Sequence, residues 1–291
     1  MNVAYVNGVY APRSRAAVSI EDRAVQFADS VYEVWGLRDG RFADEEGHFA
    51  RLARSLAELR MAAPMSEAAL RQVLREVVRR NRVRDGLVYL QISRGAARRD
   101  HAFPNPPVAP TIIVTASRMD RRALDARAEK GVAVVTVADI RWSRCDIKTT
   151  GLLANALARQ QARENGAFEA WLVRDGFVTE ASASNAWIVD SRGVLRTAPE
   201  SDNILRGVTR AAILRLARER QMAVEERAFT LEEALAAREA FITSASAGAL
   251  AVTRIDGRAI GDAVPGPITR TLRAAYLHAA YAGGAAARAH G

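Results

Sequence analysis

Residues 141–151 read Arg-Trp-Ser-Arg-Cys-Asp-Ile-Lys-Thr-Thr-Gly, and they separate two different patterns. The apolar run at 132–138 before them predicts a β-strand, whereas the apolar spacing at 152–165, closed by Gly166, predicts a helix. Loops between such rigid elements often hold catalytic side chains. The stretch therefore predicts a strand-to-helix connection that carries Lys148 in a mixed α and β fold.

Lys148 stands out because the chain uses arginine almost everywhere else. Of the 42 basic residues, only Lys130 and Lys148 are lysines. An amine forms a Schiff base with an aldehyde, whereas a guanidinium does not. Lys130 lies in a charged stretch ahead of a strand, which is typical of a solvated residue. Lys148 is therefore the candidate nucleophile. The lysine argument alone is equally consistent with a catalytic residue and with a surface residue.

The first half of the chain reads as an N-terminal α/β subdomain over residues 1–119. Helical spacing of apolar residues begins at Gly47 and again at Ser66. A Pro- and Arg-rich loop at 94–107 separates two of the strands. The predicted strands are 5–9, 18–20, 31–37, 41–42, 87–93 and 111–115.

The second half reads as a C-terminal α/β subdomain over residues 131–291, joined to the first by a charged linker at 120–130. It contains a hairpin at Asp175-Gly176, a helix after Gly207 and a short helix at 231–237. A last helix precedes the tail at 282–291, which we expect to be disordered. The predicted strands after 132–138 are 186–189, 194–197, 224–228 and 240–244.

The composition is that of an ordinary globular protein. The chain has 291 residues, 49% hydrophobic and 26% charged, which excludes collagen and a disordered chain. Its single cysteine, Cys145, cannot form an internal disulfide, and the N-terminus lacks the pattern of a secretory signal. The longest apolar runs are far shorter than the roughly 20 residues of a membrane helix. We therefore expect a cytoplasmic protein that needs no metal.

The net charge of +9 raises the alternative of a basic, nucleic-acid-binding protein that is not an enzyme. The arginines, however, are scattered along helices and often stand beside acids, as Arg218 and Arg220 flank Glu219. This arrangement favours a solvated basic surface with no nucleic-acid partner.

Three polar segments of the second half are candidate site material. Ser182, Ser184 and Asn185 follow Glu180, and small hydroxyl residues fill 243–248 after a strand. Such residues most often satisfy backbone groups in turns. The third segment gives a more specific prediction, since Gly207 and Thr209 stand at the start of a helix. Its first amides and the positive end of its dipole predict an anion site, although capping alone would explain the threonine.

In this order the motifs resemble the fold-type IV, or class IV, pyridoxal-phosphate aminotransferases, and within them the D-amino-acid (D-alanine) aminotransferases. The resemblance extends to about residue 280 and implies a two-subdomain fold with the cofactor between the subdomains. The motifs that carry it are Glu-Asp-Arg-Ala-Val-Gln-Phe-Ala-Asp-Ser-Val-Tyr-Glu-Val at 21–34, His48 with Arg51, Arg94-Gly through Arg99 and His101, Asp-Ile-Lys at 146–148, Val-Thr-Glu with Ser-Ala-Ser-Asn within 178–185, and Ile-Leu-Arg-Gly-Val-Thr-Arg at 204–210.

The resemblance implies pyridoxal 5′-phosphate as the cofactor, bound to Lys148 through a Schiff base. The released amine of Lys148 would then move a proton between the substrate and the cofactor. Glu180 would face the pyridine nitrogen and keep it protonated. The remaining residues that the resemblance assigns to cofactor binding are Arg51, Ser184, Asn185, Leu205, Gly207, Val208, Thr209, Ser244 and Ala245.

Some positions depart from the family pattern. Ala245 stands where the D-alanine aminotransferases have a hydroxyl residue on the phosphate, which removes one hydrogen bond worth roughly 0.5–1.5 kcal/mol. Ala28 and Ser30 often correspond to glycine, and Ala183 to serine; these small-for-small changes alter the shape of the pocket. His48, Arg141 and Glu169 match a supporting polar network around the cofactor.

Tyr32, Arg99 and His101 match the residues that bind the substrate α-carboxylate in the D-amino-acid enzymes. The resemblance implies a homodimer in which the loop of Arg99 and His101 reaches the neighbouring site. It also implies a ping-pong transfer of the amino group from a D-amino acid such as D-alanine to a 2-oxo acid such as 2-oxoglutarate. The alternatives of the same fold are a branched-chain L-amino-acid aminotransferase, an aminodeoxychorismate lyase and an (R)-amine transaminase.

Overall fold

The computed structural model describes residues 2–281, which form two compact units. The first unit contains the chain up to Asp120 together with Ile147–Gly151. The second contains Arg121–Asp146 and the chain from Leu152 onward. Lys148, expected in the C-terminal subdomain, is thus grouped with the N-terminal unit, because its segment pairs with a strand there. The predicted tail at 282–291 lies outside the described residues.

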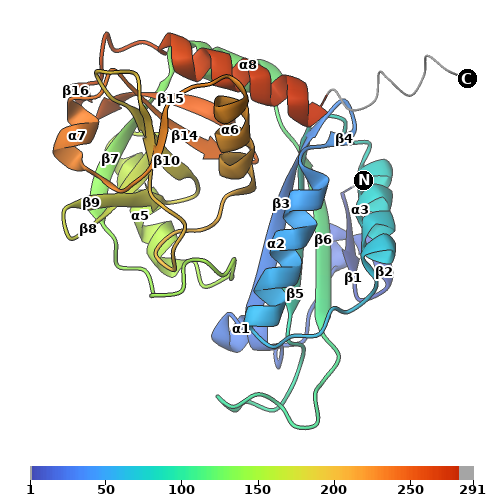
Figure 1. Cartoon of the computed structure of the whole chain (residues 1–291). Coiled ribbons are helices and arrows are strands. Elements are labelled where there is room, and N and C mark those ends of the chain that lie inside the picture. The colour runs from blue at the N-terminus through green and yellow to red at the C-terminus, as the bar shows by residue number, and fades with distance from the viewer. Residues whose placement is uncertain (1, 282–291) are drawn as a thin grey trace, which may run out of the picture. The chain divides into compact units, whose positions relative to one another are not determined.

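The first unit is a six-stranded antiparallel sheet with two helices on one face (Figure 1). Its strands follow the order β2-β1-β6-β5-β3-β4. The bounds are β1 Val3–Val6, β2 Val9–Pro12, a 3₁₀ turn Arg13–Arg15, α1 Arg23–Phe27, β3 Ser30–Arg38, β4 Arg41–Phe42, α2 Glu45–Glu58, α3 Glu67–Asn81, β5 Gly86–Ser93 and β6 Thr111–Arg118.

Helices α2 and α3 form because their apolar residues recur on one face. Ser66 caps α3 by accepting a hydrogen bond from the Ala69 N–H, at 3.3 Å. Leu52 and Leu74 are buried in the core against the inward-facing residues of the sheet, such as Trp35 of β3. This packing fixes β3, which carries Tyr32, relative to α2, which carries Arg51.

The second unit is built on a ten-stranded mixed sheet. Strand β7 runs parallel to both β8 and β15, and the other neighbouring strands are antiparallel except for β11 and β12. The bounds are α4 Arg121–Lys130, β7 Val132–Ala138, α5 Leu153–Glu164, β8 Glu169–Arg174, β9 Phe177–Ala181, β10 Asn185–Val189, β11 Leu195–Thr197, α6 Val208–Glu219, β12 Val224–Glu226, β13 Phe229–Thr230, α7 Leu231–Leu235, β14 Glu239–Ser244, β15 Gly248–Ile255, β16 Arg258–Ala259 and α8 Pro267–Tyr281.

Helices cover this sheet where its strands are apolar. Helices α6 and α8 pack on each other and on β14 and β15 (Figure 1). Trp187 and Phe241 stack in the core beneath them, with ring centroids 5.3 Å apart. Helix α5 packs on β8 and β7 through Ala158 and Ala162. The mixed helix and strand architecture confirms the predicted fold class.

Several predicted elements are wrong in detail. The predicted strand 5–9 is broken by a turn at Asn7-Gly8, so that it forms a hairpin of two strands. Val18 and Ile20, predicted as a strand, pair with no strand in the described chain and are 39% and 82% exposed. The charged stretch predicted as a linker forms α4, although none of its residues is buried.

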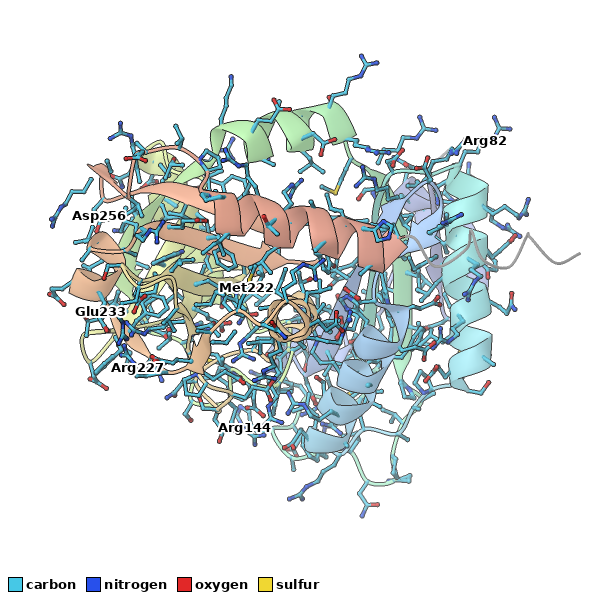
Figure 2. The ribbon with its side chains drawn as sticks, turned by 45° about the horizontal axis from the view of Figure 1, so that its top comes forward. Arg82, Arg144, Met222, Arg227, Glu233 and Asp256 are labelled. Carbon is cyan, nitrogen blue, oxygen red and sulfur yellow. The ribbon has the colours of Figure 1, made fainter. Side chains whose placement is uncertain are left out.

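Many basic residues of the surface are paired with acids. Arg227 and Glu233, labelled in Figure 2, lie together with Nη2 and Oε1 2.6 Å apart. Arg71 contacts Glu45, Glu46 and Glu67 in the same way. This pairing agrees with the solvated surface expected from the sequence. Within residues 2–281, no helix is both long and apolar enough to span a membrane.

Candidate active site

Lys148 is held by backbone contacts to two elements of the first unit. Its carbonyl accepts a hydrogen bond from the Tyr32 N–H of β3 at 3.0 Å, and its own N–H donates to Ser55 Oγ of α2 at 3.3 Å. A bridge between Val31 and Thr149 continues the pairing. The side chain of Lys148 therefore starts from a fixed backbone, as a catalytic amine requires.

The Lys148 amine lies over the ring of Tyr32, with Nζ 4.1 Å from the ring centroid. Tyr89 of β5 packs beside Tyr32, with ring centroids 5.7 Å apart. Burial, together with Tyr32, raises the pKa of Tyr89 to about 12, and its hydroxyl donates to Gln91 Oε1 at 2.8 Å. The amine thus faces an aromatic surface whose neighbouring phenol stays neutral at ordinary pH. Two of the predicted residues, Lys148 and Tyr32, are in contact.

Arg51 is fixed by a buried carboxylate that the sequence analysis did not single out. Glu33 is fully buried and accepts from Arg51 Nε at 2.7 Å and from Arg51 Nη2 at 2.8 Å. His48 Nδ1 lies 2.7 Å from the same carboxylate. Burial lowers the pKa of His48, and so do the positive charges of Arg51 and Lys148, against the opposing effect of Glu33. Arg51 is therefore a positioned guanidinium and not an ordinary exposed arginine.

The Glu33 pairing predicts an acid-sensitive unit. Burial alone would raise the pKa of Glu33, but Arg51 and His48 lower it from 4.5 to about 2. A depressed carboxyl pKa stabilises the fold above the unfolded pKa and loses this effect as pH falls from about 4.5 to 2. We expect Glu33→Gln to lower the free energy of unfolding by about 3 kcal/mol at pH 7. The difference from the parent should shrink steadily below pH 4.5.

Denaturant unfolding at pH 7, 5, 4 and 3 measures this effect. Glu21→Gln is the matched control, because Glu21 is an exposed acid of the same unit. It should follow the parent at every pH. A Glu33→Gln deficit that stayed constant down to pH 3 would contradict the ion-pair explanation.

Arg99 and His101 lie in the connection between β5 and β6, which projects beyond the end of the sheet (Figure 1). Both are exposed, and both lie against Phe27 of α1. The Arg99 guanidinium carbon is 5.2 Å from the centroid of the Phe27 ring, and the His101 ring centroid is 5.4 Å from it. Within residues 2–281, no hydrogen bond or ring contact joins either of them to Tyr32. The structure therefore brings Arg99 and His101 together but does not bring either of them into contact with Tyr32, the third predicted carboxylate ligand, among the described residues.

Glu180 is the centre of the polar cluster in the second unit. It lies on β9 and is 5% exposed. Arg141 donates to Oε1, Asn185 Nδ2 donates to Oε2 at 2.9 Å, and the Leu205 N–H donates at 3.1 Å. Burial raises the pKa of Glu180 to about 7, although Arg141 and the Leu205 N–H act to lower it. A second acid, Asp139, holds Arg141 Nη2 at 2.8 Å.

The predicted anion site lies at the start of α6. Gly207 is the N-cap residue, and no described side chain caps this end of the helix. A Cβ at Gly207 would overlap Asn185 Oδ1, so glycine is required for the close approach of the two segments. Thr209 is 3% exposed, with Oγ1 3.4 Å from the hydroxyl of Tyr276. The first amides of α6, including those of Val208 and Thr209, have no acceptor within the helix and suit an anion.

The remaining predicted residues of the second unit lie in two turns. Ser244 is the last residue of β14 and Ala245 follows it. Ser244 Oγ lies 3.2 Å from Ser246 Oγ in the turn that begins there. Ser184 Oγ donates to Glu169 at 2.8 Å, and Glu169 also accepts from the Ala183 N–H. Burial raises the pKa of Glu169 against these hydrogen bonds. Glu169 thus fixes the turn that leads into Asn185.

Sequence reasoning missed Glu33, for which a signal existed. Val31 and Trp35 are inward-facing residues of a strand, so the alternation of a strand also places Glu33 inward. A carboxylate on a core face needs a charged or hydrogen-bonding partner. Arg23 and Asp29, whose Nε and Oδ2 lie 2.7 Å apart in the same unit, were also not singled out, and nothing in the sequence distinguishes Arg23 from the other arginines.

Known proteins match this chain in sequence over most of its length. A family model described as "Amino-transferase class IV" matches residues 30–255. The D-alanine aminotransferase of Bacillus licheniformis is 42% identical over 92% of this chain and 94% of its own length. That of Staphylococcus epidermidis is 38% identical over 94% of this chain and 96% of its own length.

Solved structures give the same fold. A branched-chain amino acid aminotransferase of T.th., solved with pyridoxamine 5′-phosphate, has a TM-score of 0.86 and is 28% identical. The match covers 96% of this chain and 94% of the chain of that enzyme. The branched-chain enzyme of Escherichia coli is similar at a TM-score of 0.87 and 24% identity, with the same two coverages. The family match spans most of the chain, and this protein belongs to the class IV aminotransferases.

Proposed function

We propose that this chain is a pyridoxal-phosphate-dependent D-amino-acid transaminase. It takes the amino group of a D-amino acid such as D-alanine and passes it to a 2-oxo acid such as 2-oxoglutarate. The choice of D-amino acids rests on one observation. Arg99 and His101 belong to the same loop, and both side chains contact the ring of Phe27. The D-alanine aminotransferases among the relatives support the same choice.

The residues present fit pyridoxal phosphate. Glu180 is a buried carboxylate whose pKa burial raises to about 7, although Arg141 acts to lower it. A protonated ring nitrogen beside it would stabilise its charged form. The uncapped start of α6 suits a phosphate, as does the guanidinium of Arg51. Lys148 supplies the amine to which an aldehyde binds. When bound, the cofactor accepts the electron pair that remains after the substrate loses its α-proton.

The chain's own residues would divide the work as follows. Lys148 Nζ would move one proton between the α-carbon of the substrate and the cofactor in each half-reaction. Glu180 would keep the ring nitrogen of the cofactor protonated, while Asn185 and the Leu205 N–H hold the carboxylate in place. Ser184, Leu205, Ser244 and Ala245 would help to hold the cofactor, as the resemblance to the family implies.

Arg99, His101 and Tyr32 would bind the substrate α-carboxylate and so select which face of the α-carbon meets Lys148. Among the described residues, neither Arg99 nor His101 shares a hydrogen bond or ring contact with Tyr32, although all three belong to the first unit. We therefore propose a homodimer in which the loop of one subunit serves the site of the other. The substrates are amino acids and 2-oxo acids, with no nucleic acid or membrane involved.

Donor specificity tests this function. We expect purified protein with pyridoxal phosphate and 2-oxoglutarate to form pyruvate from D-alanine, and at least about 100-fold less 2-oxo acid from L-alanine, L-leucine or L-valine. In the same assay Arg99→Ala should raise the KM for D-alanine about tenfold with the cofactor retained. Arg98→Ala, a change at the neighbouring exposed arginine, should not.

The other outcomes point to the rivals. Turnover of L-leucine or L-valine would identify a branched-chain enzyme, like the structural neighbours. Bound cofactor without transamination would favour the lyase or the (R)-amine transaminase. Salt-sensitive nucleic-acid binding without cofactor would favour the non-enzyme alternative.

A further inference from the structure

Arg23 is almost completely buried although it lies at the start of a short helix. Its side chain is 3% exposed and donates to three successive carbonyls of the loop that carries Arg99 and His101. Nη1 lies 2.6 Å from the Asp100 carbonyl and 3.1 Å from that of Ala102, and Nη2 lies 3.3 Å from the His101 carbonyl. One guanidinium therefore holds the backbone of this part of the loop.

A carboxylate fixes Arg23 in turn. Asp29 Oδ2 accepts from Arg23 Nε at 2.7 Å and from Arg94 Nε at 2.7 Å. Burial would raise the pKa of Asp29, but Arg94 and Arg23 together lower it, so the acid stays charged between them. Arg94 also donates to the Leu59 carbonyl at 2.8 Å. Arg23 is thus a fixed part of the sheet unit and not a mobile surface residue.

The base of the loop is closed independently of the Arg23 side chain. The Arg23 N–H donates to the Gly95 carbonyl at 3.0 Å, and the Ala97 N–H donates to the Glu21 carbonyl at 3.1 Å. Gly95 has a φ of +104°, and a Cβ there would overlap the Ala109 carbonyl. The two arms of the loop therefore stay together at its base. The Arg23 guanidinium in addition fixes the backbone of residues 100–102, which lie beyond that base.

Phe27, one turn after Arg23 on α1, provides the seat for the two side chains. Its ring has the guanidinium carbon of Arg23 at 4.7 Å and that of Arg99 at 5.2 Å. The ring of His101 lies 5.4 Å away. The Arg99 guanidinium lies over the aromatic ring, as cations prefer, and the His101 ring makes a tilted ring contact with it at an interplanar angle of 58°. Phe27 therefore orders both side chains while leaving them exposed.

We propose that Arg23 and Phe27 are positioning residues for substrate binding: Arg23 fixes the backbone of residues 100–102, and Phe27 seats Arg99 and His101. This inference rests on the proposed function, in which that loop binds the α-carboxylate. A ligand held in its bound geometry before the substrate arrives loses less conformational freedom on binding. Arg23 therefore acts on the affinity for the carboxylate without touching substrate or cofactor.

Arg23→Gln tests the proposal through kinetics. We expect the KM for D-alanine to rise about tenfold while kcat stays within about twofold, because the loop is loosened and Lys148 is untouched. Phe27→Leu keeps an apolar side chain on α1 and should raise KM in the same direction even if Arg23→Gln folds poorly. Arg71→Gln is the matched control. Arg71 pairs with carboxylates and lies over Phe49 at 4.3 Å in the same unit, away from the loop.

A double-mutant cycle separates positioning from general damage. Once Arg99→Ala has removed the ligand, Arg23→Gln should raise KM by less than about twofold further. An equal increase in both backgrounds would overturn the inference. Trypsin cleavage after the exposed Arg98 and Arg99, followed by mass spectrometry, gives a readout that does not depend on turnover. It should accelerate in Arg23→Gln and not in Arg71→Gln.

The outcomes also distinguish the two proposals. A parent enzyme that turns over D-alanine, with an unchanged KM in Arg23→Gln and Phe27→Leu, would overturn the positioning role alone. A parent without D-amino-acid turnover would overturn the proposed function and, with it, the role of Arg23 in carboxylate binding.

Discussion

Lys148→Ala is expected to lower transaminase turnover by a factor on the order of 10⁴, the largest effect of any single change in this chain. Among the described residues, Lys148 supplies the only amine over the ring of Tyr32, with Nζ 4.1 Å from the ring centroid. The substitution removes this amine. The backbone contacts to Tyr32 and Ser55 do not involve the side chain, so the fold should survive. The measurement is pyruvate formation from D-alanine together with the absorption band of the bound cofactor.

The composition supplies the control for this experiment. Lys130 is the other lysine of the chain and is exposed at the end of α4, so Lys130→Ala should leave both turnover and absorption unchanged. Borohydride treatment of the parent with pyridoxal phosphate should label the peptide that contains Lys148. Labelling of Lys130, or normal turnover in Lys148→Ala, would remove the assignment.

Much of the fold was predictable because its elements follow local rules. Helices α2 and α3 show the apolar spacing of helices packed on a core, and β5 and β6 lie where the apolar runs predicted strands. The errors have local causes as well. Val18 and Ile20 are β-branched, but no strand of the described chain pairs with them, so propensity alone misled the prediction. Helix α4 has no buried face and hence no periodicity from which to predict it.

The residues of the site were predictable to different degrees. Lys148 was singled out because lysine is rare in this chain, and the start of α6 because Gly207 and Thr209 fit a helix N-terminus. The contacts between residues far apart in the sequence were not predictable, even though strand alternation indicates that Glu33 is buried. Glu33 and Arg51 meet through the packing of α2 on β3, and Arg23 reaches residues 100–102 through contacts that span more than 70 positions of sequence. No local pattern records contacts of that range.

Glu180→Gln is expected to lower kcat roughly 10²- to 10³-fold, because the charge that we propose stabilises the ring nitrogen is lost while the shape of the side chain is kept. The amide oxygen of the glutamine can still accept from the Leu205 N–H, which preserves the turn before Gly207. Lys148 is unaffected, so the cofactor should still be attached in the borohydride experiment.

The control for Glu180→Gln is Glu239→Gln, which alters another buried carboxylate of the second unit. Glu239 is 6% exposed and accepts from the Ile268 and Thr269 N–H groups at 2.9 and 2.8 Å at the start of α8. Its loss should reduce the free energy of unfolding without a comparable change in kcat. If both variants lowered kcat equally, the effect of Glu180 would reflect the burial of a polar group. A loss confined to Glu180→Gln would instead locate the electrostatic contribution at the carboxylate whose pKa burial raises to about 7.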